Sequence, residues 1–233
     1  MNDLKIYVGY DSREDVAYRV CKHSIESKNS NTDIIPIRQS DMRDKGLYWR
    51  GLDPMSSTEF TFTRFLVPAL QDYKGWALFI DCDTLLLTDV AELFDLADEQ
   101  YAVMVAKHEY WPSKLKKMDG KDQHLYPRKN WSSVMLINCG HEQNLALTKH
   151  LVSHPNTTGA TLHRFSWLDD EVIGTLHHQW NWLINWYHEP MDGTPKLLHY
   201  TEGGPWLAEY FDSRYADVWK NEYKSVTGKT FAL

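Results

Sequence analysis

Two aspartates, Asp81 and Asp83, are the residues of this sequence whose type and spacing most directly indicate chemistry. They follow the apolar run Trp76-Ala77-Leu78-Phe79-Ile80, which has the length of a strand buried on both faces. Ligands of open α/β sheets bind beyond the carboxyl ends of the strands, where both carboxylates can point to one position. Paired carboxylates suit Mg²⁺ or Mn²⁺, above all when a diphosphate provides further oxygens. A simple turn is the alternative, because Asp is common after strands.

Two classes of enzyme use such a pair. In phosphatases of the haloacid dehalogenase type, the pattern D-x-D-x-T, which Asp81-Cys82-Asp83-Thr84 matches, makes Asp81 a nucleophile and Asp83 a general acid or base. In nucleotide-sugar glycosyltransferases the pair holds a metal ion that bridges the diphosphate leaving group. The phosphatase motif normally follows the first strand of its fold. Here a complete strand–helix unit precedes it, which favours the transferase.

The elements that would position these carboxylates alternate along the chain. Short apolar or β-branched runs predict strands at 5–10, 33–37, 76–80, 101–106, 134–137 and 196–198. Apolar spacing predicts a helix capped by Asp11 or Ser12, a second at 58–70 with a kink or a new first turn at Pro68, and a third at 142–152. This order predicts an α/β fold with a mainly parallel central sheet flanked by helices. The polar stretch Glu109–Asn130 is expected to be a long surface excursion, and no linker divides the chain.

Composition excludes several other classes. Lys plus Arg is 25 and Asp plus Glu is 32, and the formal charge of -7 argues against a general nucleic-acid binder, which needs a basic face. The three cysteines are far apart, so neither a disulfide framework nor a zinc knuckle is expected. No secretory signal or transmembrane run is visible, and we expect a soluble, cytoplasmic protein. The Trp-rich segment Trp180–Trp186 is expected to form either a homodimer contact or an acceptor groove.

Beyond the D-x-D, the sequence resembles glycosyltransferase family 8 and its glycogenin-like members. Five segments match in order, over roughly Lys5 to Trp206. They are the first strand and its end at 7–11, the Arg64 segment with the D-x-D strand, Asp169-Asp170-Glu171 in place of D-Q-D, Trp180-Asn181, and His199 to Trp206, which is similar to H-x-x-G-x-K-P-W. The resemblance implies a GT-A-type, Rossmann-like single domain over residues 1–233. Its nucleotide-binding half would be about 1–107 and its acceptor and sugar half about 108–233.

The resemblance also implies an activity and its residues. The expected reaction moves a hexose from a nucleoside-diphosphate sugar, a UDP-sugar by resemblance, to a glycan, lipid or protein acceptor, with retention at the anomeric carbon. Asp81, Asp83 and His199 would hold Mn²⁺ or Mg²⁺, and an imidazole ligand favours Mn²⁺. The other implied roles are donor contacts for Val8, Tyr10, Asp11, Arg64, Asp81 and Gly203, catalytic positions for Asp169, Asp170 and Arg64, and substrate contacts for Asn138, Asp169 and Trp206.

Three departures from the family pattern bear on these roles. Gly204 stands where the family has a Lys that neutralises the diphosphate, and Arg64, Arg13 or Lys107 could replace it. The middle residue of D-Q-D is Asp170, which could act as a nucleophile or only shift the acceptor contacts. The Gly of the family's N-x-G stretch is absent from residues 130–138. A nucleotide- or carbohydrate-binding module without catalysis therefore stands as an alternative, beside the phosphatase.

Overall fold

Six strands form the central sheet of the computed structural model, which describes residues 4–51, 53, 56–109, 128–189 and 191–233. The strand order is β2-β1-β3-β6-β5-β7. Strand β6 pairs antiparallel with both of its neighbours, and all the other pairs are parallel, which confirms the prediction of a mainly parallel sheet. The strands are β1 (Leu4–Gly9), β2 (Thr32–Ile37), β3 (Trp76–Ile80), β5 (Val103–Ala106), β6 (Val134–Asn138) and β7 (Ile173–Leu176).

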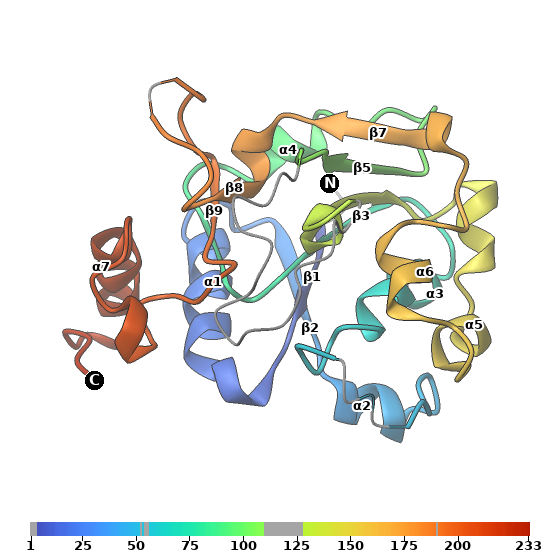
Figure 1. The fold of residues 1–233 in the computed structure, drawn as a ribbon, viewed down its shortest axis with the longest axis horizontal. Coiled ribbons are helices and arrows are strands. Elements are labelled where there is room, and N and C mark those ends of the chain that lie inside the picture. Colours follow the sequence, from blue (N-terminus) through green and yellow to red (C-terminus); the bar gives the residue numbers. More distant parts are fainter. Residues whose placement is uncertain (1–3, 52, 54–55, 110–127, 190) are drawn as a thin grey trace.

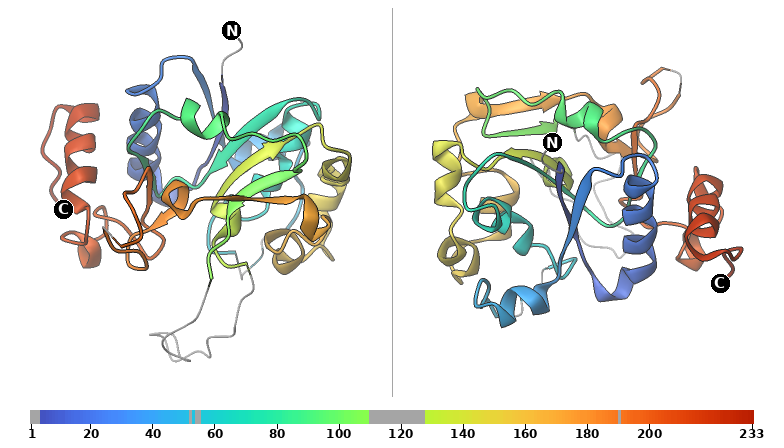
Figure 2. Two further views of the ribbon diagram at one scale, coloured as in Figure 1. Left: turned by 90° about the horizontal axis from the view of Figure 1, so that it is seen from above. Right: turned by 180° about the vertical axis from the view of Figure 1, so that it is seen from behind.

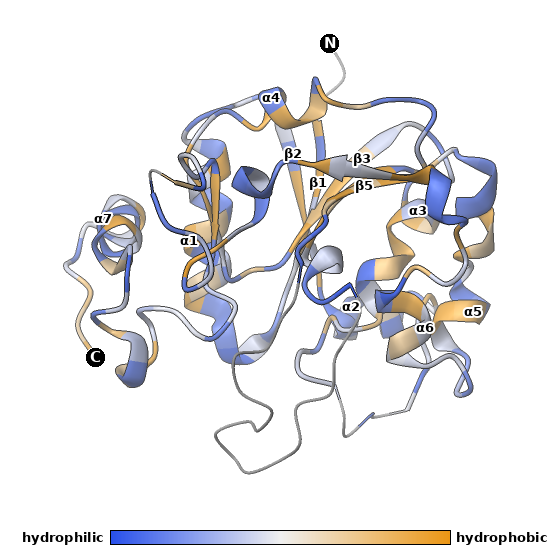
Figure 3. Cartoon of the chain, turned by 45° about the horizontal axis from the view of Figure 1, so that its top comes forward, coloured by the Kyte–Doolittle hydropathy of each residue, from blue (hydrophilic) through white to orange (hydrophobic). Residues whose placement is uncertain are grey.

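Helices cover the sheet on both faces. Helix α1 (Asp15–Glu26) lies on one side with α7 (Ala216–Thr227) packed outside it, and α3 (Val67–Leu70), α5 (Lys149–Ser153) and α6 (Gly159–His163) lie on the other side (Figures 1 and 2). Two further short helices are α2 (Gln39–Asp44) and α4 (Ala91–Phe94). The most hydrophobic residues concentrate on the strands between these layers (Figure 3). The layered arrangement explains why β3 is apolar along its whole length.

A second, smaller sheet positions the candidate site. Its order is β4-β9-β8, built from β4 (Thr84–Leu86), β9 (Leu197–His199) and β8 (Trp182–Leu183). Strand β4 begins directly after the D-x-D and pairs antiparallel with β9, with Thr84 opposite His199. This register places a residue from near the end of the chain beside the two aspartates. The small sheet packs on α1 and α7 through a separate apolar cluster, which includes Trp182 and Trp219.

Two of the predicted helices take a different local form. Residues 59–62 form turns, and a 3₁₀ helix over Thr63–Leu66 leads into α3, with Pro68 in the first turn of α3 as expected. The predicted helix at 142–152 is a 3₁₀ helix, Glu142–Ala146, followed by α5 after a break. The break arises because the Thr148 side chain accepts a hydrogen bond from the Leu151 N–H and starts a new helix. Of the expected surface excursion, residues 110–127 lie outside the described residues.

The expected surface of tryptophans at Trp180–Trp186 is wrong for two of its three tryptophans, whereas Trp186 is half-buried. Trp180 and Trp182 are exposed by only 3% and 0% and belong to the two apolar clusters. Cys21, Cys82 and Cys139 are all buried and form no disulfide. Within the described ranges, no helix is both long enough and apolar enough to cross a membrane.

Candidate active site

The turn after β3 fixes the direction of the two aspartates. The Asp81 N–H donates to the Ser133 carbonyl at 2.9 Å, and the Thr84 hydroxyl donates to the Asp81 carbonyl at 2.8 Å. The Asp83 carbonyl then accepts the Tyr200 N–H at 2.9 Å, which joins the turn to the end of β9. Both carboxylates are thereby held at the carboxyl end of β3, where the sequence predicts a ligand site.

Asp81, Asp83 and His199 come together as the sequence predicts. One ligand atom from each lies within 4.8 Å of the others, and His199 Nε2 is 3.4 Å from Asp83 Oδ1. That contact is not a hydrogen bond, and among the described residues Oδ1 of Asp83 is a buried oxygen that no donor reaches. A buried carboxylate oxygen without a donor is costly unless another partner is present. Two carboxylates and an imidazole are a donor set that suits Mn²⁺, so the three residues could hold it.

Burial and mutual charge shift the pKa values of this group in opposite directions. Burial raises the pKa of Asp81 to about 7, although Arg64 opposes the change. Burial would also raise the pKa of Asp83, but the neighbouring His199 outweighs it and the pKa is lowered. Burial would lower the pKa of His199, yet Asp83 holds it above its usual value. The site therefore brings two acidic groups together in a partly buried position, where a divalent cation would relieve their repulsion.

Arg64 is committed to Asp81. Its Nη1 donates to Asp81 Oδ1 at 2.7 Å and to the Ser132 carbonyl at 2.9 Å, and its side chain is 6% exposed. The guanidinium lies 4.9 Å and 5.1 Å from the ring centres of Phe60 and Phe79. Within the protein, Arg64 is thus paired with an acidic side chain at the end of β3.

The end of β1 forms a second polar cluster at the same edge. Asp11 is fully buried and accepts bonds from Arg13 Nη2 at 2.6 Å and from the Glu59 N–H at 3.1 Å. Burial alone would raise the pKa of Asp11, but Arg13 holds it below its usual value. The Tyr10 ring is half-buried, with the Arg38 guanidinium 4.3 Å from its centre.

Val8 does not reach this edge. It is fully buried in β1, between Pro36 of β2 and Ile80 of β3. The core encloses the Val8 side chain, so only its backbone could take part in the expected donor contact, which stays a prediction.

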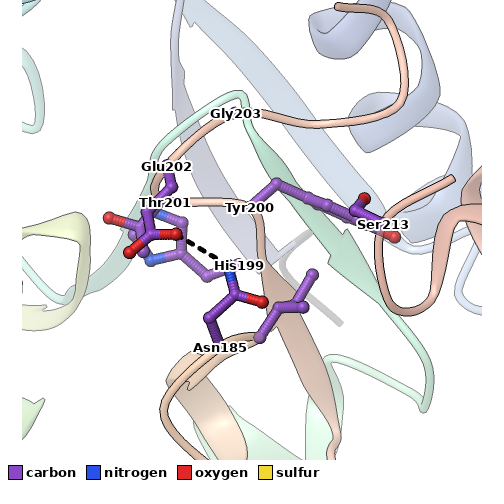
Figure 4. Close-up of a pocket in the computed structure, with 8 residues that line it drawn as sticks. Asn185, His199, Tyr200, Thr201, Glu202, Gly203 and Ser213 are labelled. Carbon is purple, nitrogen blue, oxygen red and sulfur yellow. Dashed lines mark hydrogen bonds between the residues drawn. The ribbon is translucent and has the colours of Figure 1, made fainter. Parts of the chain in front are cut away.

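A small cavity adjoins His199. Gly203, Asn185, Glu202 and Ser213 also line it (Figure 4). Gly203 has a φ of 131°, and a Cβ there would lie 2.6 Å from the Tyr210 ring, so the turn requires glycine. Across the cavity, the Asn185 amide donates to the Glu202 carboxylate at 2.7 Å.

Trp206 lies in the separate apolar cluster that includes Trp182 and Trp219, contrary to its predicted substrate contact. Its side chain packs on Tyr200 and Trp219, and the residue is 8% exposed. Its indole N–H donates to Glu14 at 3.3 Å. Both the ring and its polar atom are thus already in use within the protein.

Asn138 is placed at the wrong end of the sheet for an acceptor contact. Because β6 is antiparallel to β3, Val134 pairs with Ile80 beside the D-x-D, and Asn138 pairs with Trp76 at the start of β3. The Asn138 amide donates to Glu99. The prediction for Asn138 is wrong because the sequence did not reveal the direction of β6.

Asp169 and Asp170 lie outside the cluster of Asp81, Asp83 and His199. Asp169 accepts a hydrogen bond from the Gln143 amide at 2.8 Å. Asp170 begins the 3₁₀ helix Asp170–Val172 before β7, and its exposed carboxylate pairs with Arg128 at 2.5 Å. Their catalytic roles stay predictions.

Two residues beside the site were missed by the sequence analysis. Glu14 is half-buried, and its pKa is raised by burial and by Asp83. It accepts hydrogen bonds from the Cys82 thiol and from Trp206. The Asn181 side chain is hydrogen-bonded to Nδ1 of His199, the ring nitrogen that does not face Asp83. The only sequence indication for Asn181 was the match of Trp180-Asn181 to the family pattern, and that match gave Asn181 no role.

The sequence profile of Glycosyl transferase family 8 matches residues 3–209. The chain belongs to this family. Protein CDI of Arabidopsis thaliana is 53% identical over 223 residues, which cover 94% of this chain and 85% of that protein. General stress protein A of Bacillus subtilis (strain 168) is 24% identical over 152 residues, 63% of this chain and 50% of that protein.

Solved structures show the same fold. The glycosyltransferase GlyE of Streptococcus pneumoniae TIGR4 has a TM-score of 0.64 at 17% identity, covering 97% of this family 8 chain and 62% of GlyE. The galactosyltransferase LgtC, solved with donor and acceptor sugar analogs, has a TM-score of 0.53 at 14% identity, covering 96% of each chain. The prediction of a GT-A-type fold is confirmed. As a family 8 member with this fold, the protein is a glycosyltransferase rather than a phosphatase.

Proposed function

We propose that this family 8 protein is a metal-dependent hexosyltransferase that uses a nucleoside-diphosphate sugar, a UDP-sugar in the first instance. The observation that carries the proposal is the meeting of Asp81, Asp83 and His199 at the carboxyl end of β3. A half-buried acidic pair with a buried imidazole suits a divalent cation, and a divalent cation suits a diphosphate.

The chemistry required is the stabilisation of charge as the bond between the sugar and the diphosphate breaks. Positive charge develops at the anomeric carbon and negative charge on the leaving diphosphate. Mn²⁺, held by Asp81, Asp83 and His199, would act as a Lewis acid on the diphosphate oxygens. Arg64 orients Asp81 through the 2.7 Å bond and favours its ionised form. Gly203, which has no side chain, allows backbone to approach the donor beside His199.

The cations that could replace the family's missing Lys are already bound within the chain. Arg13 is bidentate on Asp11, Arg64 is on Asp81, and Lys107 donates to the Ile173 carbonyl at 2.6 Å. Burial lowers the pKa of Lys107 as well. We therefore propose that the divalent cation neutralises a larger part of the diphosphate charge here than in relatives that keep the Lys.

The finer parts of the proposal concern stereochemistry and partners. We propose retention at the anomeric carbon, with Asp169 or Asp170 on the sugar side, and Tyr10 and Asp11 on the nucleotide side. The acceptor is a glycan, lipid or protein. A cytoplasmic location and a homodimer are kept as predictions.

Turnover separates this proposal from a binding module. The purified protein is incubated with UDP-glucose, UDP-galactose or UDP-N-acetylglucosamine, with and without Mn²⁺, and released UDP is measured. We expect Mn²⁺-dependent UDP release from at least one donor, reduced by about 100-fold or more in Asp83→Asn. Thermal stabilisation by UDP without turnover of any donor would favour the non-catalytic module. UDP release that is unaffected by chelation would contradict metal dependence.

A further inference from the structure

A buried amide holds the side of the His199 ring that faces away from Asp83. Asn181 is fully buried, and its Oδ1 lies 2.9 Å from Nδ1 of His199. Its Nδ2 lies 3.0 Å from the Asn130 carbonyl and 2.9 Å from the Ser133 hydroxyl. All the polar atoms of the Asn181 side chain therefore have partners.

These partners determine where the hydrogens are. The Asn130 carbonyl can only accept, so the Asn181 atom that faces it must be the NH₂ group. The Ser133 hydroxyl donates to the same carbonyl at 2.6 Å, which leaves its oxygen to accept from Asn181. The carbonyl oxygen of Asn181 must then face His199, and because that oxygen only accepts, Nδ1 of the ring must carry hydrogen.

We infer that Asn181 is a positioning residue that holds His199 as the Nδ1–H tautomer, with the Nε2 lone pair directed toward Asp83 and available to a divalent cation. The inference rests on the proposed metal site and adds to it a residue that does not touch the ion. A second hydrogen bond to a ligating imidazole fixes both its tautomer and the orientation of its ring.

The same amide links His199 to the D-x-D strand. Ser133, which accepts from Asn181, also provides the carbonyl that binds the Asp81 N–H. The adjacent Ser132 carbonyl accepts from Arg64, which holds the Asp81 side chain. The 3₁₀ helix Trp131–Ser133 thus connects two ligands that come from different sheets. Loss of Asn181 should loosen His199 without directly removing any group that would bind the metal.

The test compares Asn181→Leu with a matched control. Asn144 is also a buried Asn, and its Nδ2 donates to two backbone carbonyls, of Ala102 and Asn138, both at 2.8 Å and both away from the site. Asn144→Leu should therefore lose similar stability but leave the site intact. The first readout is the His199 tautomer, taken from ¹⁵N shifts of the neutral ring in the metal-free protein. The second is Mn²⁺ affinity from calorimetry or electron paramagnetic resonance.

We expect wild type and Asn144→Leu to show the Nδ1–H tautomer, and Asn181→Leu to lose it and to bind Mn²⁺ about 10- to 100-fold more weakly. Asn181→Asp keeps an acceptor for Nδ1–H and should retain the tautomer and most of the affinity. A wild-type ring with its hydrogen on Nε2 would overturn the inference, and this measurement needs no variant to fold. Wild-type Mn²⁺ affinity in a folded Asn181→Leu would overturn it as well. If the wild type has the Nδ1–H tautomer but binds no Mn²⁺, the metal proposal fails and the tautomer assignment stands.

Discussion

His199 and Asp83 face each other across the β4–β9 pair, with Nε2 of the imidazole 3.4 Å from Oδ1 of the carboxylate. The antiparallel register, which pairs His199 with Thr84, holds the imidazole beside the acid. The imidazole is buried, whereas the Asp83 side chain remains 21% exposed. This pair is the part of the site on which the proposed metal chemistry depends.

Removing the charge of Asp83 should abolish metal-linked nucleotide binding. Mn²⁺ with UDP, at about 100 times their dissociation constant, should raise the melting temperature of the wild type by roughly 5–10 °C. Asp83→Asn keeps the size of the side chain but removes the anionic ligand, so this increase should disappear. Differential scanning fluorimetry measures it, with Asp95→Asn, an exposed aspartate after α4, as the control that keeps the response. An undiminished increase in Asp83→Asn would refute the ligand assignment.

Removing Arg64 should be costly to stability. Arg64→Met leaves Asp81 buried without its cation, and breaking a buried pair in this way costs about 3–5 kcal/mol. The exposed pair of Lys5 and Asp33, with side chains 40% and 42% exposed, provides the comparison. Lys5→Met should change the free energy of unfolding by no more than about 1 kcal/mol. Urea unfolding gives both values. Equal effects in the two variants would show that the Arg64–Asp81 pair stabilises the fold no more than an exposed ion pair does.

The sequence predicts the central sheet and the meeting of Asp81, Asp83 and His199 because those signals are local or chemically specific. The apolar run at 76–80 and the carboxylates after it identify β3 and the edge where the site lies. His199 was located through a motif that ends a strand. Asp11 was expected to cap the next helix, and its side chain does accept the Arg13 N–H there.

The positions of the remaining site residues depend on strand direction and tertiary contacts, which no local sequence pattern indicates. Asn138 lies at the far end because β6 runs against its neighbours, and a strand's sequence does not state its direction. Trp206 is enclosed by α1 and α7, but the packing of α7 is a tertiary contact between the two ends of the chain. Asn181 is hydrogen-bonded to Asn130 and Ser133, which lie 51 and 48 residues earlier in the chain.

Gly203 should be intolerant of a side chain for two separable reasons. Gly203→Ala forces a positive φ on alanine and also places a Cβ 2.6 Å from the Tyr210 ring. Gly228 has a φ of 70° with nothing within 4 Å of a Cβ, so Gly228→Ala isolates the backbone cost, about 1 kcal/mol. We expect Gly203→Ala to lose more stability than this and also to bind UDP with Mn²⁺ several-fold more weakly. Equal losses of stability with unchanged UDP affinity would argue against a donor contact at this turn.

Acid should destabilise the fold through His108. Burial lowers the pKa of His108 to about 3, against about 6.5 in the unfolded chain. The unfolded state therefore takes up a proton first as the pH falls. The contribution of neutral His108 to the free energy of unfolding is complete above about pH 6.5. It is lost progressively as the pH falls to about 3, by up to about 1.4 kcal/mol per pH unit. His108→Gln should flatten the fall in unfolding free energy between pH 6.5 and pH 4, measured by urea titration. The same slope in wild type and variant would show that His108 is not the group that titrates.

A crystal grown with Mn²⁺ and UDP, and measured at the manganese absorption edge, tests the central claim most directly. The account predicts one anomalous peak among Asp81, Asp83 and His199, within coordinating distance of His199 Nε2 and of the UDP diphosphate. A peak bound elsewhere, or UDP bound with no peak between these three side chains, would contradict it.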